Sequence, residues 1–308
     1  MSRNSKIREL RRLSTEKFNP ASKDLDQKSA LEIARVINAQ DAKVAAAVKR
    51  ALPQIGRAIE IIAEALRKGG RLIYVGAGTS GRIAALDAAE CPPTFNTDPK
   101  MVQFVIAGGP KALGAAVEAN EDSRKLGERS IATKKPGKND VIVGIAASGR
   151  TPFTVAAVEY ARGHGAKTIA VTCAPKSALA KAADIAIVTA VGPEVIAGSS
   201  RMKAGSAQKM VLNMISSGAM TRLGYVYGNL MVNVHLKNEK LRQRGITILE
   251  QAAGIDRSTA EQSLKLAKNS VPAALVMLKA KVSLAEAARA LKSAQGNVRQ
   301  AITRARKR

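Results

Sequence analysis

The chain has little of what many binding and metal sites are built from. Among its 308 residues there is no tryptophan, aromatic residues make up 3%, and there are two cysteines and two histidines. So few aromatic side chains exclude the stacking platforms that hold single-stranded nucleic acid. Cys91 and Cys173 lie far apart and match no metal-ligand spacing. We therefore expect buried, reduced thiols and no metal site.

Long apolar runs are also missing. No uninterrupted apolar run reaches the roughly 18 residues of a membrane-spanning helix. The basic residues 2–17 are not followed by the apolar segment of a signal peptide. We expect a cytoplasmic, globular protein without a membrane partner, since 46% hydrophobic residues are ample for a core.

Acidic residues are scarce beside basic ones. Lysine and arginine number 50 against 24 acids, which gives a net charge of +26 and raises the question of nucleic-acid binding. Much of the excess lies at the two ends, in residues 8–12 and 304–308. More of it falls on one predicted helical surface series: Lys237, Lys240, Arg242 and Arg244. We interpret the charge as solvated surface that steers anionic substrates, and expect no nucleic-acid partner.

Two glycine-rich turns are the most informative features present. Residues 76–82 read GAGTSGR and residues 144–152 read GIAASGRTP, and we call them the first and second cradle. Each follows a short apolar run and opens a stretch with helical spacing, so each predicts a strand, a turn and a helix. Glycines admit an anion to the backbone, helix N-termini offer N–H groups, and hydroxyls add donors. Neither turn has the spacing of a nucleotide motif, which favours a small phosphorylated metabolite.

The apolar pattern predicts an α/β fold. Five β-rich runs, separated by helical stretches, predict a parallel five-stranded sheet flanked by helices: 71–75, 102–107, 140–145, 168–172 and 185–189. Both cradles then lie at the carboxyl ends of strands, where such sheets bind ligands.

Helical spacing predominates on both sides of this sheet region. Residues 29–52 and 54–67 predict two N-terminal helices with a break at Pro53. Residues 201–223 predict a long helix, which an amphipathic stretch over 229–244 continues as a hairpin. The tail predicts a compact three-helix subdomain. We interpret it as a packing or dimer-buttressing element rather than part of an active site. We expect an N-terminal helical segment over 1–58, a phosphate-binding α/β domain over 59–244 and a C-terminal helical subdomain over 245–308.

Two groups of acids follow the first cradle. In the run LDAAECPPTF, two prolines are expected to stop a helix directly behind Glu90. Further on, a predicted helix carries Glu118, Glu121 and Asp122. On composition alone each of these acids is an exposed helix charge.

Several runs together resemble a known family. VGAGTSGR, LDAAECPPTF, IAGGPKAL, GIAASGRTPF, YGNLMVNV and VGPEVIAGSSRMKAGSAQKMVLNMIS resemble the N-acetylmuramic acid 6-phosphate etherases, from about residue 13 to 244 and loosely beyond. The resemblance implies a sugar isomerase (SIS) fold and a 6-phosphosugar substrate. It also implies release of D-lactate to leave N-acetylglucosamine 6-phosphate in cell-wall amino sugar recycling, with no metal or organic cofactor. Small departures occur where the family has arginine, threonines and asparagine: Phe18, Ser200, Ser206 and Ala174.

The resemblance also assigns roles to residues. The family's acid/base glutamate precedes Cys-Pro-Pro and is here Glu90, and its second functional glutamate begins the Glu-Asp pair and is here Glu121. We expect Glu90 to serve the leaving group and water, and Glu121 to remove the alpha proton. The resemblance implies a phosphate site made of hydroxyls and one lysine: Thr79, Ser80, Ser148, Thr151, Ser199, Ser200 and Lys203.

The position of Glu90 suggests how the protein assembles. A helix that begins near Ser80 places Glu90 about 15 Å further along it, beyond the reach of a hexose. Either the chain folds back after Glu90, or this glutamate serves a phosphate bound by a neighbouring subunit. We favour a homodimer with shared sites, in line with the dimeric habit of the family.

Three other functions remain open. The glucokinase regulatory protein shares this fold and part of the pattern as a non-catalytic phosphosugar sensor, although both glutamates are kept here. The charge suggests a sugar-responsive transcription regulator, but residues 1–27 are too short for the helix-turn-helix domain that such proteins carry. The fold alone also permits a ketose-aldose isomerase.

Overall fold

The computed structural model describes residues 14–307, except 116, 118, 119 and 237. The basic residues 8–12, Glu118, Lys237 and Arg308 therefore lie outside the described residues. The chain divides into two compact units. The first unit contains residues 1–88 and 100–216, and the second contains residues 89–99 and 217–308.

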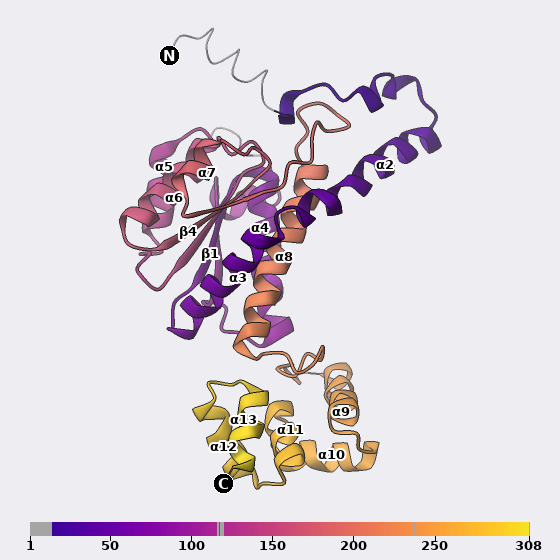
Figure 1. The fold of residues 1–308 in the computed structure, drawn as a ribbon, viewed down its shortest axis with the longest axis vertical. Coiled ribbons are helices and arrows are strands. Elements are labelled where there is room, and N and C mark those ends of the chain that lie inside the picture. The colour runs from indigo at the N-terminus through magenta and orange to yellow at the C-terminus, as the bar shows by residue number, and fades with distance from the viewer. Residues whose placement is uncertain (1–13, 116, 118–119, 237, 308) are drawn as a thin grey trace. The chain divides into compact units, whose positions relative to one another are not determined.

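A parallel sheet forms the centre of the first unit (Figure 1). Its five strands occur in the order β2-β1-β3-β4-β5. Their bounds are β1 (Leu72–Gly76), β2 (Val102–Ile106), β3 (Val141–Ile145), β4 (Lys167–Thr172) and β5 (Ile185–Val188). Every residue of β1 and β3 is buried, as expected for strands covered on both faces. The predicted parallel five-stranded sheet is confirmed.

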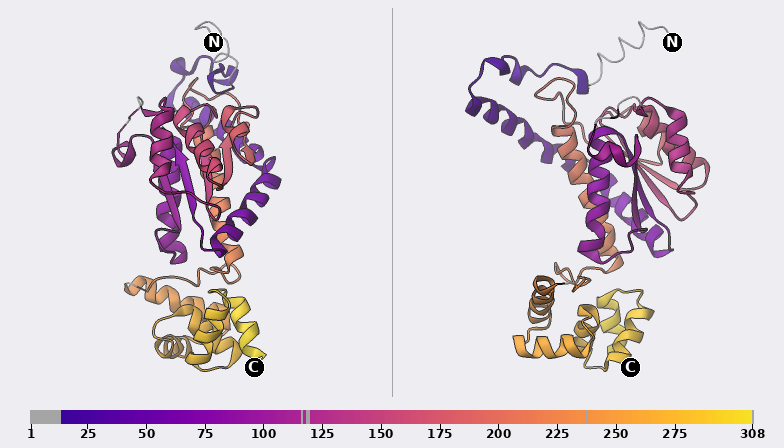
Figure 2. Two further views of the ribbon diagram at one scale, coloured as in Figure 1. Left: turned by 90° about the vertical axis from the view of Figure 1, so that its left-hand side faces the viewer. Right: turned by 180° about the vertical axis from the view of Figure 1, so that it is seen from behind.

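Helices cover both faces of this sheet (Figures 1 and 2). On one face lie α5 (Arg124–Ala132), α6 (Pro152–Gly163) and the short α7 (Ala178–Ala182), and on the other α3 (Leu52–Arg67) packs on β1, β3 and β5. The core between the sheet and α5 and α6 consists of buried apolar side chains that include Ile73, Val75, Val105, Ile131, Ile142 and Phe153. These side chains hold α5 and α6 against the sheet.

The N-terminal segment packs on a loop of the first unit. After three short turns of 3-10 helix, α2 (Ala30–Lys49) begins at a capping box formed by Ser29 and Glu32. Pro53 lies in the first turn of α3, so the predicted break is confirmed. The three turns are η1 (Ser14–Glu16), η2 (Pro20–Ser22) and η3 (Leu25–Gln27).

The prediction that a helix stops at Pro92 and Pro93 is wrong. The helix α4 (Gly78–Phe95) continues through Pro92 and Pro93. It ends where Asn96 adopts the left-handed conformation with φ 55° and donates its N–H to the carbonyl of Pro92, 2.8 Å away. Each proline removes one backbone N–H donor, but the helix runs only two residues beyond Pro93, and an asparagine in the left-handed region ends it.

The predicted helix over residues 229–244 is also wrong in its first half. The helix α8 (Lys203–Leu223) is followed by turns, and no helix occurs over the described residues from 229 to 238. The next helix, α9 (Glu239–Ala253), begins where the side chain of Asn238 accepts from the N–H of Leu241. As the N-cap residue, Asn238 has an extended backbone, so the helix cannot continue upstream of it.

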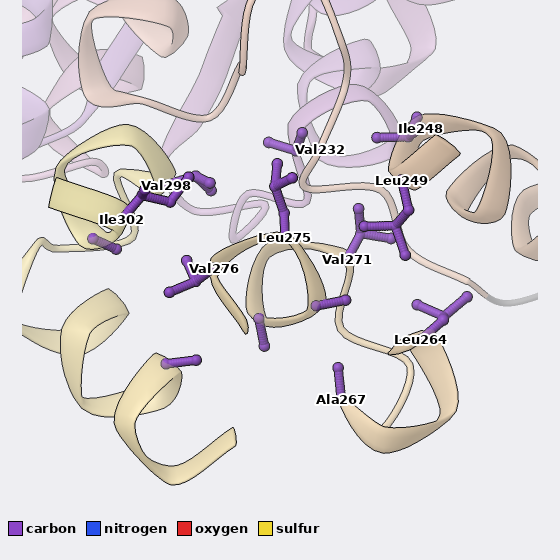
Figure 3. Packing of buried hydrophobic residues seen from close by; sticks show 14 of the residues in the cluster. Val232, Ile248, Leu249, Leu264, Ala267, Val271, Leu275, Val276, Val298 and Ile302 are labelled. Atoms are coloured by element: carbon purple, nitrogen blue, oxygen red, sulfur yellow. The ribbon is translucent and has the colours of Figure 1, made fainter. Parts of the chain in front are cut away.

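The second unit is helical and has its own apolar core (Figure 3). After α9 come α10 (Arg257–Leu266), α11 (Val271–Ala280), α12 (Leu284–Ser293) and α13 (Val298–Arg306). The predicted count of three tail helices is too low, because Asn297 caps α13 as a helix separate from α12. Leu275 of α11 is fully buried among residues from the neighbouring helices, including Leu264 and Val298.

Candidate functional site

The two cradles lie side by side at the carboxyl edge of the sheet. The last residue of β1, Gly76, pairs with Ile145 at the end of β3. Parallel strands in register bring the turns that follow them to the same edge. A Cβ on Gly76 would come within 2.9 Å of the backbone nitrogen of Gly81, so only glycine permits this close approach.

The second cradle is shaped by one left-handed glycine. Gly149 has φ 63°, and a Cβ there would lie 2.2 Å from the hydroxyl of Ser177. The helix α6 then begins behind Thr151, whose side chain makes no capping hydrogen bond. The hydroxyl of Ser148 accepts from the N–H of Arg150 at 3.3 Å. The turn thus presents hydroxyls and a helix N-terminus at one place, a combination that suits an anion.

The segment 199–205 lies against the first cradle. A Cβ on Gly205 would contact the methyl of Thr79 at 3.5 Å and the carbonyl of Ser200 at 3.8 Å. The structure therefore brings Thr79 together with the loop that carries Ser199 and Ser200. Ser80 is almost buried, and its hydroxyl donates to Oε1 of Gln208 at 3.0 Å.

Lys203 is buried rather than open to solvent. It is 1% exposed, and its Nζ donates to Oε1 of Gln40 at 3.1 Å. Burial lowers the pKa of Lys203, and the nearby carboxylate of Glu194 opposes that shift. The same carboxylate accepts from the backbone N–H groups of Lys203 and Ala204 at 3.0 and 2.9 Å, which caps α8. Sequence reasoning did not identify Glu194 or Gln40 at this place.

Glu121 joins the two cradles. Its Oε1 lies 3.1 Å from the position that a Cβ on Gly78 would take, so the carboxylate lies against the first cradle. Its backbone carbonyl accepts from the N–H of Phe153, in the first turn of α6, at 3.0 Å. The expected helix around Glu121 and Asp122 is wrong: both lie in a turn that precedes α5. Ser123 caps α5, and the helix begins only after it.

Arg82 holds part of the segment that leads to Glu121. Its guanidinium donates to the carbonyls of Ala112, Leu113 and Ala115 at 3.0, 3.3 and 2.8 Å. Arg82 is the arginine of the GTSGR run, and the sequence alone gives no sign of its role. Its five N–H donors let one side chain fasten several carbonyls, which lysine could not do in the same geometry.

Glu90 is an exposed residue of α4. The helix is continuous from Ser80 to Glu90, and ten residues of α-helix rise about 15 Å. Among the residues that the structure describes, no three His, Cys, Asp or Glu side chains lie close enough together to hold a metal ion. No helix in the described part of the chain is long and apolar enough to cross a membrane.

Similarity to known proteins identifies the family. A protein from Symbiobacterium thermophilum, named N-acetylmuramic acid 6-phosphate etherase, is 58% identical over 89% of this chain and 91% of its own length. The chain belongs to the N-acetylmuramic acid 6-phosphate etherase family. Family members with the same name from Aeromonas hydrophila and Actinobacillus pleuropneumoniae are 50% and 46% identical over 93% and 98% of this chain. These two matches cover 96% and 99% of the relatives' own lengths.

Domain models and solved structures agree with the fold of this etherase family member. The glucokinase regulatory protein N-terminal SIS domain matches residues 54–162, and the SIS domain matches residues 135–217. A phosphoheptose isomerase from Francisella tularensis has a TM-score of 0.51 and is 20% identical. The match covers 63% of this chain and all of that one, and it shows the fold alone. The SIS fold implied by the resemblance is confirmed.

Proposed function

We propose that this chain cleaves the lactyl ether of N-acetylmuramic acid 6-phosphate, which gives N-acetylglucosamine 6-phosphate and D-lactate. The observation that carries this proposal is the 58% identity to a protein of that name over 91% of its length. Both cradles and both glutamates of the family pattern are also present in this chain. The reaction belongs to cell-wall amino sugar recycling, which agrees with the expected cytoplasmic location.

The substrate phosphate is held at the cradles. Hydroxyl donors and helix N-termini at one sheet edge suit a phosphate dianion without help from a metal. Lys203 belongs to this group for its positive charge, although Gln40 holds its ammonium. The residues we assign to the phosphate are Thr79, Ser80, Ser148, Thr151, Ser199, Ser200 and Lys203.

Two carboxylates are enough for the chemistry. In the open-chain sugar the aldehyde acidifies the alpha proton, and Glu121 removes it as a base. The bond from the adjacent carbon to the lactyl oxygen breaks, and Glu90 protonates that oxygen. D-lactate departs, and the sugar becomes an unsaturated aldehyde. Water then gives a proton to Glu90 and its oxygen adds to the carbon that bore the ether, while the protonated Glu121 returns its proton to the alpha carbon. Glu121 suits the first role because its carboxylate lies against the first cradle.

The protein acts as a homodimer with shared sites. Ten residues of helix between Ser80 and Glu90 rise more than the length of a hexose, so Glu90 serves a substrate held by the neighbouring subunit. Mixed dimers that combine a Glu90→Ala subunit with a Ser80→Ala, Ser148→Ala subunit should regain activity, because one of their two sites is intact. Properly formed mixed dimers without activity would contradict shared sites.

Substitution of the two glutamates tests the assigned roles. Glu90→Gln and Glu121→Gln preserve volume but remove acid/base capacity, so each should keep phosphosugar binding and lose at least about a hundredfold in kcat. Glu128→Gln makes the same change on the exposed face of α5 and is the matched control. Full kcat in either test variant would refute the role given to that glutamate.

A non-catalytic phosphosugar sensor is the second candidate. The match of residues 54–162 to the glucokinase regulatory protein N-terminal SIS domain favours it. A sensor would bind N-acetylmuramic acid 6-phosphate without releasing lactate. An assay that measures both binding and lactate therefore separates the two functions.

A further inference from the structure

Gln208 of α8 contacts the first cradle and is not among the residues assigned above. Its Oε1 accepts from the hydroxyl of Ser80 at 3.0 Å, and the two side chains are 1% and 9% exposed. Its Nε2 is buried and has no hydrogen-bond partner among the residues that the structure describes. A buried amide donor without a partner is costly, so native proteins seldom keep one without a reason.

The hydroxyl of Ser80 has only one hydrogen. In the arrangement seen, that hydrogen is directed to Oε1 of Gln208 and cannot be donated to an anion in the cradle. A half turn of the Gln208 amide exchanges its oxygen and nitrogen. Nε2 would then donate to the oxygen of Ser80, and the hydroxyl hydrogen would be free for a phosphate oxygen.

The half turn also changes which buried atom lacks a partner. The amide nitrogen gains Ser80 as its acceptor, and the amide oxygen takes the place without a donor. Carbonyl oxygens that lack a donor are tolerated in protein interiors more often than N–H groups that lack an acceptor. The turned amide therefore suits the cradle when an anion accepts the hydrogen that Ser80 no longer gives to Gln208.

We infer that Gln208 is a positioning residue for phosphate binding, which directs the hydroxyl hydrogen of Ser80 toward the anion once its amide has turned. This inference rests on the proposed function, because it requires the substrate phosphate in the first cradle. Gln208 acts through Ser80 and does not itself touch the phosphate.

Two substitutions separate this role from simple packing. Gln208→Glu keeps the size of the side chain, but a carboxylate can only accept, so it retains the Ser80 hydrogen and adds negative charge beside the anion. Gln208→Met keeps the length without any hydrogen bond, which leaves Ser80 free to rotate. Gln54→Glu makes the same charge change at an exposed position of α3 and is the control.

The experiment measures binding of N-acetylglucosamine 6-phosphate to the full chain by calorimetry, together with KM and kcat for lactate release. Gln208→Glu should weaken binding at least about tenfold and raise KM by a similar factor, with kcat at saturation within about twofold, since one charge-assisted hydrogen bond is lost. Gln208→Met should weaken binding by about threefold, and it should have no further effect in a Ser80→Ala background.

Three outcomes would overturn the inference. The first is wild-type affinity in Gln208→Glu. If Gln208→Glu does not fold, wild-type affinity in Gln208→Met has the same meaning. Additive losses in the Ser80→Ala, Gln208→Met double variant would show that Gln208 does not act through Ser80. If Ser80→Ala alone keeps full affinity, the assignment of the first cradle to phosphate fails as well. If only the Gln208 variants behave like wild type, that assignment stands and this inference alone falls.

Discussion

Gly78→Ala is predicted to disturb Glu121 through a single added methyl group. Gly78 has φ 51°, and its Cβ would lie 3.1 Å from Oε1 of Glu121. A contact that short requires the carboxylate to move by a few tenths of an ångström. A misplacement of about 1 Å in an active site can lower the rate about a hundredfold, so we expect about a tenfold loss of kcat for this smaller shift.

Gly109→Ala is the matched control. Gly109 also has a left-handed backbone, with φ 66°, but nothing lies within 4 Å of the Cβ that would be added. Each alanine should therefore lower the free energy of unfolding by a similar amount, about 1–2 kcal/mol, because both adopt a conformation that L-residues disfavour. Only Gly78→Ala should lose kcat, and Gly109→Ala should stay within about twofold of wild type.

The assay is the rate of lactate release at saturating substrate, with thermal unfolding measured in parallel. The loss in Gly78→Ala should disappear in a Glu121→Gln background, because the perturbation acts through that carboxylate. Equal losses of kcat in the two alanine variants would refute the reasoning. Wild-type kcat in Gly78→Ala would refute it as well.

Two further predictions concern stability. Burial alone would raise the pKa of Asp140, but hydrogen bonds from Arg71 and from a backbone N–H outweigh it and hold the pKa below its ordinary 3.8. The ionised carboxylate therefore stabilises the fold fully above about pH 4, and this stabilisation is lost as the pH falls through the lowered pKa. The free energy of unfolding should fall less on acidification in Asp140→Asn than in the wild type, as acid unfolding curves would show. Gly127→Ala should lower the free energy of unfolding by about 1–3 kcal/mol, since its Cβ would lie 2.1 Å from the carbonyl of Phe153. Gly163→Ala has open space and should not destabilise the fold, as denaturant titrations of both variants would show.

The sheet and its cradles could be predicted because their signals are local. Buried parallel strands appear in the sequence as short apolar runs, and all five predicted runs coincide with strands to within one or two residues. The glycines that follow β1 and β3 mark the turns directly. Because parallel strands end at the same sheet edge, the meeting of the two cradles followed from topology.

Helix ends were less predictable because one side chain decides each of them. Pro92 and Pro93 predict a helix end, yet α4 ends only where Asn96 adopts a left-handed conformation. Ser123 and Asn238 cap helices that begin later than their amphipathic patterns suggest. Such caps contribute about 1 kcal/mol each, enough to shift a boundary without leaving a periodic signal.

Individual side-chain contacts between distant helices could not be predicted. Ser80 and Gln208 meet across 128 positions of the chain. Asp87 accepts from Tyr74 at 2.7 Å and from Ser216 at 3.1 Å inside the first unit, where burial raises the pKa of its carboxyl and both hydrogen bonds oppose that shift. Neither network follows a spacing rule, because the Ser80–Gln208 and Asp87–Ser216 contacts arise only when α8 packs beside α4.

The central claim is that this chain removes the lactyl ether by elimination followed by addition of water. The most direct measurement incubates the purified protein with N-acetylmuramic acid 6-phosphate in oxygen-18 water and locates the label in both products by mass spectrometry. Elimination followed by addition of water should give unlabelled D-lactate, together with N-acetylglucosamine 6-phosphate that carries one label at the carbon that bore the ether. Label in the lactate instead, or binding without any lactate, would contradict it.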